Sequence, residues 1–188
     1  IKAVHPDPTD SSVPHVGAVC VYNDMVQIAR EQLDAAGGRD IPVAAVSTAF
    51  PSGRASLEVK ERDTRDAILR GATEIDMVID RGAFLAGDLT KVYEEIAYIK
   101  NICGDKAHLK VILETGELVT YDNVRKASFL ATKDAIKQLV LVKETAGDEW
   151  LNPHLFRIGA SALLNDLLMQ RMKLRDGNYA GPNYVTLD

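Results

Sequence analysis

The sequence contains only two cysteines, Cys20 and Cys103, and it has no long apolar run. The two cysteines lack the spacing of a metal site, and a chain of 188 residues does not need a disulfide framework. We therefore interpret both as free thiols in a reducing cytoplasm. No apolar run reaches the roughly 18 residues of a membrane span, and no secretory leader is visible. These absences predict a cytoplasmic protein without membrane contact.

Positive charge is also scarce, because 27 acidic residues outnumber 22 basic residues and give a formal net charge of −5. Acids and bases are mixed along the chain without a basic block, which argues against nucleic acid as a partner. The histidines form no HExxH motif or other ligand pattern, so we expect no bound metal. They are His5, His15, His108 and His154.

Apolar and amphipathic segments alternate over most of the chain. We expect the first helix to begin at Asn23 or Asp24 and to stop at Gly37. Apolar strands that alternate with amphipathic helices predict a parallel sheet. An open doubly wound sheet and a closed β/α barrel both fit, but no Gly-rich dinucleotide motif follows the first strand, which favours the barrel. Expected strands begin near residues 16, 41, 74 and 108, and later helices cover about 55–70, about 89–102 and residues from 121 onward.

This alternation breaks in the second half of the chain. The segment "NVRKASFLA" runs directly into "TKDAIKQLVLVKETAGDEWL", without an intervening strand or a Gly or Pro turn. A last apolar strand, Leu155–Ser161, brings the expected number of strands to about five. An eight-strand barrel usually needs about 250 residues. The sequence therefore predicts a single β/α-barrel domain over residues 1–188 that is incomplete.

Several long motifs carry a resemblance to one family. The segments "GATEIDMVIDRGAFLAGD", "HLKVILETGEL" and "GDEWLNPHLFRIGASALLNDLL", with "AVCVY" and "FPSG" before them, resemble deoxyribose-phosphate aldolases. The resemblance implies a (β/α)8 TIM barrel and a class I aldolase without a cofactor. It also implies reversible cleavage of 2-deoxy-D-ribose 5-phosphate to acetaldehyde and glyceraldehyde 3-phosphate through a lysine Schiff base. A homodimer is a further expectation from this resemblance.

Two family motifs are absent from the sequence. The Schiff-base lysine of the family lies in a strand similar to F-I-K-T-S-T-G-K, and a second lysine lies in G-F-K-P-A-G-G. Both motifs belong between "KASFLA" and "TKDA", so we predict a gap between Ala131 and Thr132. The family's first strand, with its D-x-T motif, is expected before Ile1. The alternative is a shortened, non-catalytic barrel that binds phosphate or another subunit.

An aspartate interrupts the apolar segment "EIDMVID" at Asp76. Strand alternation places Asp76 on the same face as Val78 and Asp80, opposite three apolar residues. A buried carboxylate needs a partner, because an unpaired one costs several kcal/mol. The resemblance implies that Asp76 moves the proton in the imine and enamine steps. The alternative is a buried ion pair that serves stability alone.

The expected partner of Asp76 is Lys110. Alternation in "HLKVILET" places Lys110 on one face with Ile112 and Glu114, and an inward lysine must meet a carboxylate to remain charged. We assign Lys110 an electrostatic role in the site, because the imine-forming lysine of the family belongs to the absent strand. The alternative is a surface lysine whose ammonium reaches water.

A phosphate site is expected where the segment "RIGAS" precedes a helix. Free N–H groups at a helix N-terminus bind anions, and phosphate sites recur after the last strands of barrels. An ordinary helix cap is the alternative. Cys20 lines the aldehyde pocket by resemblance, or else it is a small apolar core residue. The residues expected to bind phosphate are Gly159, Ala160, Ser161 and Ala162.

Overall fold

The computed structural model describes residues 2–7, 9–128, 130–131, 175 and 177. Four parallel strands form one sheet in the order β1-β2-β3-β4, so each strand pairs with the next strand along the chain. Residues 121–128 are helical. The other elements are β1 (Val19–Tyr22), η1 (Asn23–Met25), α1 (Val26–Ala35), β2 (Val43–Ser47), α2 (Leu57–Leu69), β3 (Glu74–Val78), α3 (Arg81–Leu85), α4 (Leu89–Cys103), β4 (His108–Ile112) and η2 (Thr115–Glu117).

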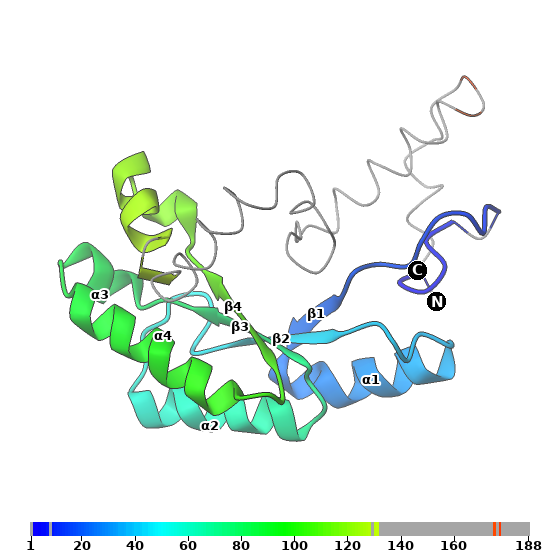
Figure 1. The fold of residues 1–188 in the computed structure, drawn as a ribbon, viewed down its shortest axis with the longest axis horizontal. Coiled ribbons are helices and arrows are strands. Elements are labelled where there is room, and N and C mark those ends of the chain that lie inside the picture. The colour runs from blue at the N-terminus through cyan, green and yellow to red at the C-terminus, as the bar shows by residue number, and fades with distance from the viewer. Residues whose placement is uncertain (1, 8, 129, 132–174, 176, 178–188) are drawn as a thin grey trace, which may run out of the picture.

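The helices α1, α2 and α4 cover the same face of this sheet (Figure 1). A doubly wound sheet reverses its strand order and carries helices on both faces. Sequential strand order with helices on one face is instead the arrangement of a barrel wall. The described residues therefore form four consecutive β/α units of an incomplete barrel, as the sequence predicts.

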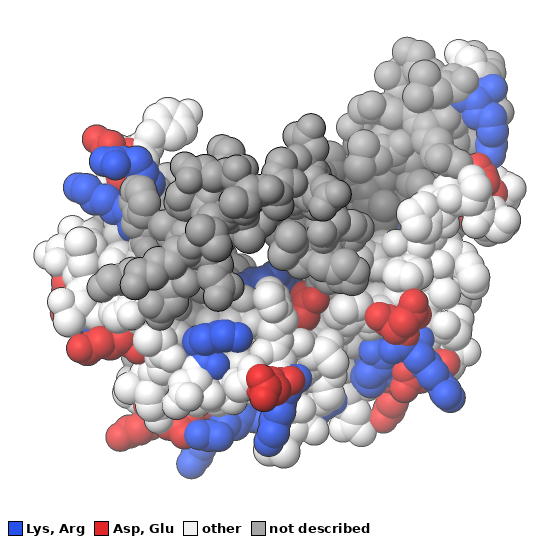
Figure 2. Space-filling view, viewed as in Figure 1, with Lys and Arg blue, Asp and Glu red and all other residues white. Residues whose placement is uncertain are grey.

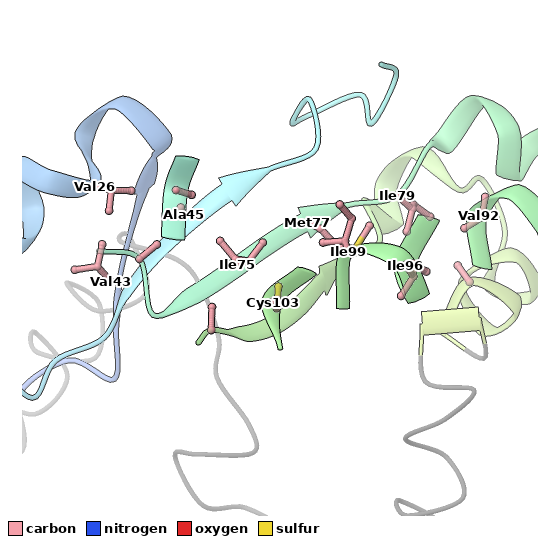
Figure 3. Packing of buried hydrophobic residues seen from close by; sticks show 14 of the residues in the cluster. Val26, Val43, Ala45, Ile75, Met77, Ile79, Val92, Ile96, Ile99 and Cys103 are labelled. Atoms are coloured by element: carbon pink, nitrogen blue, oxygen red, sulfur yellow. The ribbon is translucent and has the colours of Figure 1, made fainter. Parts of the chain in front are cut away.

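The hydrophobic core lies between the sheet and these helices. Ile75 and Met77 of β3 point toward Ile99 and Cys103 of α4 (Figure 3), and all four side chains are buried. Because alternate strand residues point to opposite faces, Glu74, Asp76 and Val78 of β3 point away from the helices. We call this opposite surface of the sheet the helix-free face.

The element boundaries agree with most expectations. The helices predicted at about 55–70 and 89–102 are observed as α2 and α4, and their N-caps are the side chains of Ser56 and Asp88. The expected cap of the first helix was wrong. Met25 is the N-cap residue of α1, and the amide of Asn23 donates instead to Asp63 of α2. The short helix α3 was not expected.

Two expectations concern residues outside the described ones. The strand predicted at Leu155–Ser161 and the junction between Ala131 and Thr132 both include such residues. Within the described part of the chain, no helix is long and apolar enough to cross a membrane. Side chains of both charge signs are interspersed over the face seen in Figure 2.

Candidate functional site

Strands β3 and β4 bring three charged residues together on the helix-free face. The pairing register sets Asp76 directly opposite Lys110, and Glu74 lies two residues before Asp76 on the same face of β3. Lys110 Nζ lies 2.9 Å from Asp76 Oδ1 and 3.2 Å from Glu74 Oε2. The contact expected between Asp76 and Lys110 is therefore present, and Glu74 is a third member. We call these residues the Lys110 cluster.

Burial and charge act against each other in the Lys110 cluster. The two carboxylate side chains are only 6% and 12% exposed, whereas the Lys110 side chain is 33% exposed. Burial alone lowers the pKa of Lys110, but the hydrogen bond and charge of Asp76, together with Glu74, outweigh burial and raise it. Lys110 therefore stays charged through the neutral pH range.

Glu74 was missed in the sequence, although a signal was present. It stands two positions before Asp76, so the alternation that selects Asp76 also selects Glu74. Asp80 shows the opposite error. Strand β3 ends at Val78, and Asp80 caps α3 by accepting a hydrogen bond from Ala83 N–H. Its expected place on the face of Asp76 was wrong because the strand ends before it.

Cys20 of β1 also reaches the Lys110 cluster. Its thiol donates to Asp76 Oδ2 across 3.5 Å, although β2 lies between the two strands. Cys20 pairs with Ala44 and Asp76 pairs with Val46, so this contact runs diagonally across β2. Contact across an intervening strand shows that the sheet is concave on its helix-free face, as a barrel interior is.

The thiol of Cys20 is free and exposed, so it is not the buried core residue that was one alternative. Although the residue as a whole is exposed, partial desolvation of its sulfur and the neighbouring charge of Asp76 raise the pKa of Cys20 to about 11. A thiol with this pKa is almost fully protonated at neutral pH. Cys20 can therefore line a site without acting as a nucleophile.

A strained turn follows β2 at the carboxyl end of the sheet. Thr48 and Ala49 have φ of 64° and 61°, which L-residues rarely adopt and which costs about 1–3 kcal/mol per residue. The Thr48 hydroxyl accepts from Val78 N–H over 2.9 Å, and its single proton lies within reach of two carbonyls, Ser47 O at 2.7 Å and Val78 O at 2.8 Å. At Gly53 a Cβ would overlap the carbonyl of Ile79. The turn is therefore packed closely against the end of β3.

The carboxyl end of β4 also departs from expectation. Glu114 was expected on the face of Lys110, but β4 ends at Ile112 and Glu114 adopts a left-handed conformation with φ of 56°. Its carboxylate lies 3.9 Å from the guanidinium of Arg81 at the start of α3. The alternation of a strand does not continue past its last residue, so Glu114 is not part of the Lys110 cluster.

A second set of charges lies on the helix side of the sheet. Lys60 of α2 is fully buried and lies 2.6 Å from Glu95 of α4. Lys91 Nζ lies 4.0 Å from Glu95 and 2.7 Å from Asp80. We call these four residues the Lys60 network. It joins α2 to α4 and ties α4 to the cap of α3.

Of the expected site residues, the structure brings Asp76, Lys110 and Cys20 together. The expected phosphate-binding residues 159–162 lie outside the described part of the chain. Among the described residues, no group of three or more His, Cys, Asp or Glu could hold a metal ion. The Lys110 cluster offers a carboxylate that can accept and donate a proton beside a fixed positive charge, which is acid–base chemistry.

Known proteins are similar to this chain in sequence. Residues 9–148 match the model of the DeoC/LacD family aldolases. Deoxyribose-phosphate aldolase of Homo sapiens is 38% identical over 215 aligned positions, which cover 87% of this chain and 67% of the human protein. The enzyme of Mus musculus is 37% identical with the same coverage. The chain thus spans about two thirds of the length of these curated relatives.

Solved structures of aldolases have a fold similar to that of this chain. The aldolase QR15 superposes with a TM-score of 0.55 at 28% identity, over 63% of this chain and 50% of that one. A crystal structure from Coccidioides immitis gives a TM-score of 0.56 at 30% identity, over 62% of this chain and 44% of that one. Together with the family match over residues 9–148, these findings show that the chain belongs to the DeoC/LacD family of aldolases.

Proposed function

We propose that this protein is a 2-deoxyribose-5-phosphate aldolase. It reversibly cleaves 2-deoxy-D-ribose 5-phosphate to acetaldehyde and glyceraldehyde 3-phosphate through a lysine Schiff base. The observation that carries the proposal is the Lys110 cluster, in which Asp76 lies 2.9 Å from Lys110 on the concave face of an aldolase barrel. The names of the human and mouse relatives support the substrate.

Asp76 supplies the acid–base step in this proposal. Formation and hydrolysis of an imine, and its conversion to an enamine, each require a proton to be moved by a positioned group. Asp76 is nearly buried, and contacts with Lys110 and with the thiol of Cys20 hold its carboxylate in place. Lys110 provides a fixed positive charge 2.9 Å from Asp76 and orients its carboxylate.

The imine-forming lysine is proposed to lie in a segment between Ala131 and Thr132 of the natural chain. The alignment with the human protein extends over 215 positions, which exceeds the 188 residues of this chain. The alignment therefore contains positions at which the human protein has residues and this chain has none. That excess supports the proposed gap, and the mass of the protein purified from its source tests it.

Recognition of the phosphate is proposed for residues 159–162, with Ser161 as the side-chain donor. Replacing Ser161 with Ala should raise KM for 2-deoxyribose 5-phosphate more than KM for unphosphorylated 2-deoxyribose. Equal effects on the two substrates contradict a phosphate site at Ser161. A cytoplasmic homodimer is part of the same proposal, and light scattering of the purified protein measures its mass.

Borohydride trapping tests the proposed function. Protein with its complete natural chain is incubated with 2-deoxyribose 5-phosphate, reduced, digested and analysed by mass spectrometry. A reduced adduct on one lysine is expected, and it should disappear when borohydride is omitted. Absence of any adduct favours the alternative, a shortened barrel that binds phosphate or another subunit without catalysis.

A further inference from the structure

Asp63 lies in the middle of α2. Aspartate is an unfavourable residue inside a helix, and at this position it is too far from the N-terminus to act as a cap. Its carboxylate instead accepts hydrogen bonds from residues at the ends of strands. Oδ2 accepts from Thr48 N–H at 2.9 Å and from the Ser47 hydroxyl at 3.2 Å, and Oδ1 accepts from the Asn23 amide at 2.9 Å. Asn23 follows β1 directly, and Ser47 ends β2. One carboxylate therefore joins the carboxyl ends of two neighbouring strands.

The residue that Asp63 holds is the strained one. Thr48 is fully buried with φ of 64°, a conformation that a β-branched residue keeps only where its surroundings enforce it. The bond from Thr48 N–H to Asp63 fixes the turn from the side of α2. The Thr48 hydroxyl, which accepts from Val78 N–H and lies 2.8 Å from Val78 O, fixes the turn from the side of β3.

This chain of hydrogen bonds ends next to the Lys110 cluster. Val78 lies two residues after Asp76 in β3, and Thr48 lies two residues after Val46, which pairs with Asp76. The link from Asp63 through Thr48 to Val78 therefore holds both strands at the place where Asp76 projects. In barrel enzymes the carboxyl ends of the strands carry the active site.

We propose that Asp63 is a positioning residue for the aldol reaction. From the helix side of the sheet it holds the turn at Ser47 and Thr48, and through that turn it fixes the end of β3 that carries Asp76. For its catalytic consequence this inference rests on the proposed function. Asp63 acts through Thr48 and Val78 and not through contact with the substrate.

Replacing Asp63 with Asn tests the proposal with little change of shape. The amide has one acceptor oxygen, so it cannot serve Thr48, Ser47 and Asn23 together. We expect kcat for cleavage of 2-deoxyribose 5-phosphate, per folded molecule, to fall about 10- to 100-fold, with KM changed by less than about threefold. Asp66→Asn is the matched control, because Asp66 lies on the same helix and pairs with Arg70 at the surface. It should leave both constants unchanged.

Alkylation of Cys20 gives a second measurement that does not depend on activity. Its sulfur lies 3.5 Å from Asp76 Oδ2, so displacement of Asp76 changes the reactivity of the thiol. Peptide-resolved mass spectrometry with iodoacetamide should show alkylation of Cys20 accelerated about threefold or more in Asp63→Asn, and unchanged in Asp66→Asn. If the wild-type protein has no aldolase activity, the proposed function fails, and this rate still decides whether Asp63 positions Asp76.

A role in stability alone predicts a different result. The melting temperature of Asp63→Asn then falls, while kcat per folded molecule and the Cys20 alkylation rate stay at wild-type values, and this outcome overturns the proposal. If Asp63→Asn does not fold, Asp63→Glu replaces it, because it keeps the charge and shifts the carboxylate by one methylene. A lowered kcat with faster Cys20 alkylation in Asp63→Glu supports the proposal, and wild-type values of both overturn it.

Discussion

Two lysines meet carboxylates on opposite faces of the same sheet, in very different surroundings. Lys60 is completely buried between α2 and α4, where its ammonium lies 2.6 Å from Glu95. Lys110 is 33% exposed on the helix-free face and contacts two carboxylates, Asp76 and Glu74. The first pair is enclosed by the hydrophobic core, whereas the second can be reached from the concave side.

Under the proposed function, the first pair serves stability and the second takes part in the reaction. In the Lys60 network, carboxylates and ammonium groups alternate and their numbers are equal. In the Lys110 cluster, one ammonium group that is 33% exposed contacts two carboxylates, so the group lies at a surface that a ligand can reach. We therefore expect changes in the Lys60 network to reduce stability, and changes in the Lys110 cluster to reduce activity.

The largest effect on stability is expected from Lys60→Met, which leaves Glu95 buried without its close partner. Removing one member of a buried ion pair costs about 3–5 kcal/mol. Urea unfolding at pH 7 measures this loss, and kcat per folded molecule should stay within about twofold of wild type. The double variant Lys60→Met/Glu95→Leu should recover most of the stability. A double variant as unstable as the single one argues against pairing as the cause.

Lys110→Met should lower activity. The expected change in activation free energy is smaller than the loss of unfolding free energy in Lys60→Met. The substitution removes the ammonium group that lies 2.9 Å from Asp76, so the Asp76 carboxylate loses a contact that holds it in place. We expect kcat to fall about 10- to 100-fold, which corresponds to about 1.4–2.7 kcal/mol. Steady-state kinetics of the folded variant measures the change. Activity close to wild type would remove Lys110 from the site.

Alkylation of Cys20 sharpens the comparison further. Because its pKa is about 11, the thiolate fraction of Cys20 at pH 7.5 is on the order of 100-fold below that of an ordinary exposed thiol, and its reaction with iodoacetamide should be at least about tenfold slower. Asp76→Asn removes a cause that raises this pKa and should accelerate the reaction. Lys110→Met removes a charge that lowers the pKa and should slow it. Equal rates in the two variants would show that the Lys110 cluster does not control the thiol.

The smallest expected effect concerns Asp80, at the end of the Lys60 network. Burial alone raises the pKa of Asp80, but hydrogen bonds from Lys91 and Ala83 N–H outweigh burial and lower it. A carboxyl whose pKa is lowered by folding stabilises the protein at every pH above its unfolded pKa of about 3.9. This contribution is lost as the pH falls through the folded pKa. Urea melts between pH 6 and about 3 should show a weaker pH dependence in Asp80→Asn. An unchanged slope contradicts the assignment.

The contact between Asp76 and Lys110 could be predicted because it depends only on strand periodicity and on the pairing of neighbouring parallel strands. Two parallel strands with known inward faces place these side chains next to each other once the pairing register is near its observed value. The same argument covers Glu74, which was overlooked. Strand periodicity did not predict on which side of the sheet Asp80 and Glu114 lie, because both residues follow the last residue of a strand.

Tertiary contacts explain what the sequence did not predict. Asn23 has the composition of a helix cap, but its amide bonds to Asp63 from another helix, so the local preference is overridden. Asp63 itself resembles an ordinary polar residue on a charged helix. Its role becomes visible only when the turn at Thr48 is seen to fold against it.

The turnover of Asp76→Asn, measured beside Glu95→Gln, tests the central claim most directly. Both variants replace a buried carboxylate with an amide of nearly the same shape, one on each face of the sheet. With 2-deoxyribose 5-phosphate as substrate, we expect kcat per folded molecule to fall about 10²- to 10⁴-fold in Asp76→Asn and to remain near wild type in Glu95→Gln. Near-normal turnover of folded Asp76→Asn would contradict the assignment of the Lys110 cluster as the catalytic centre.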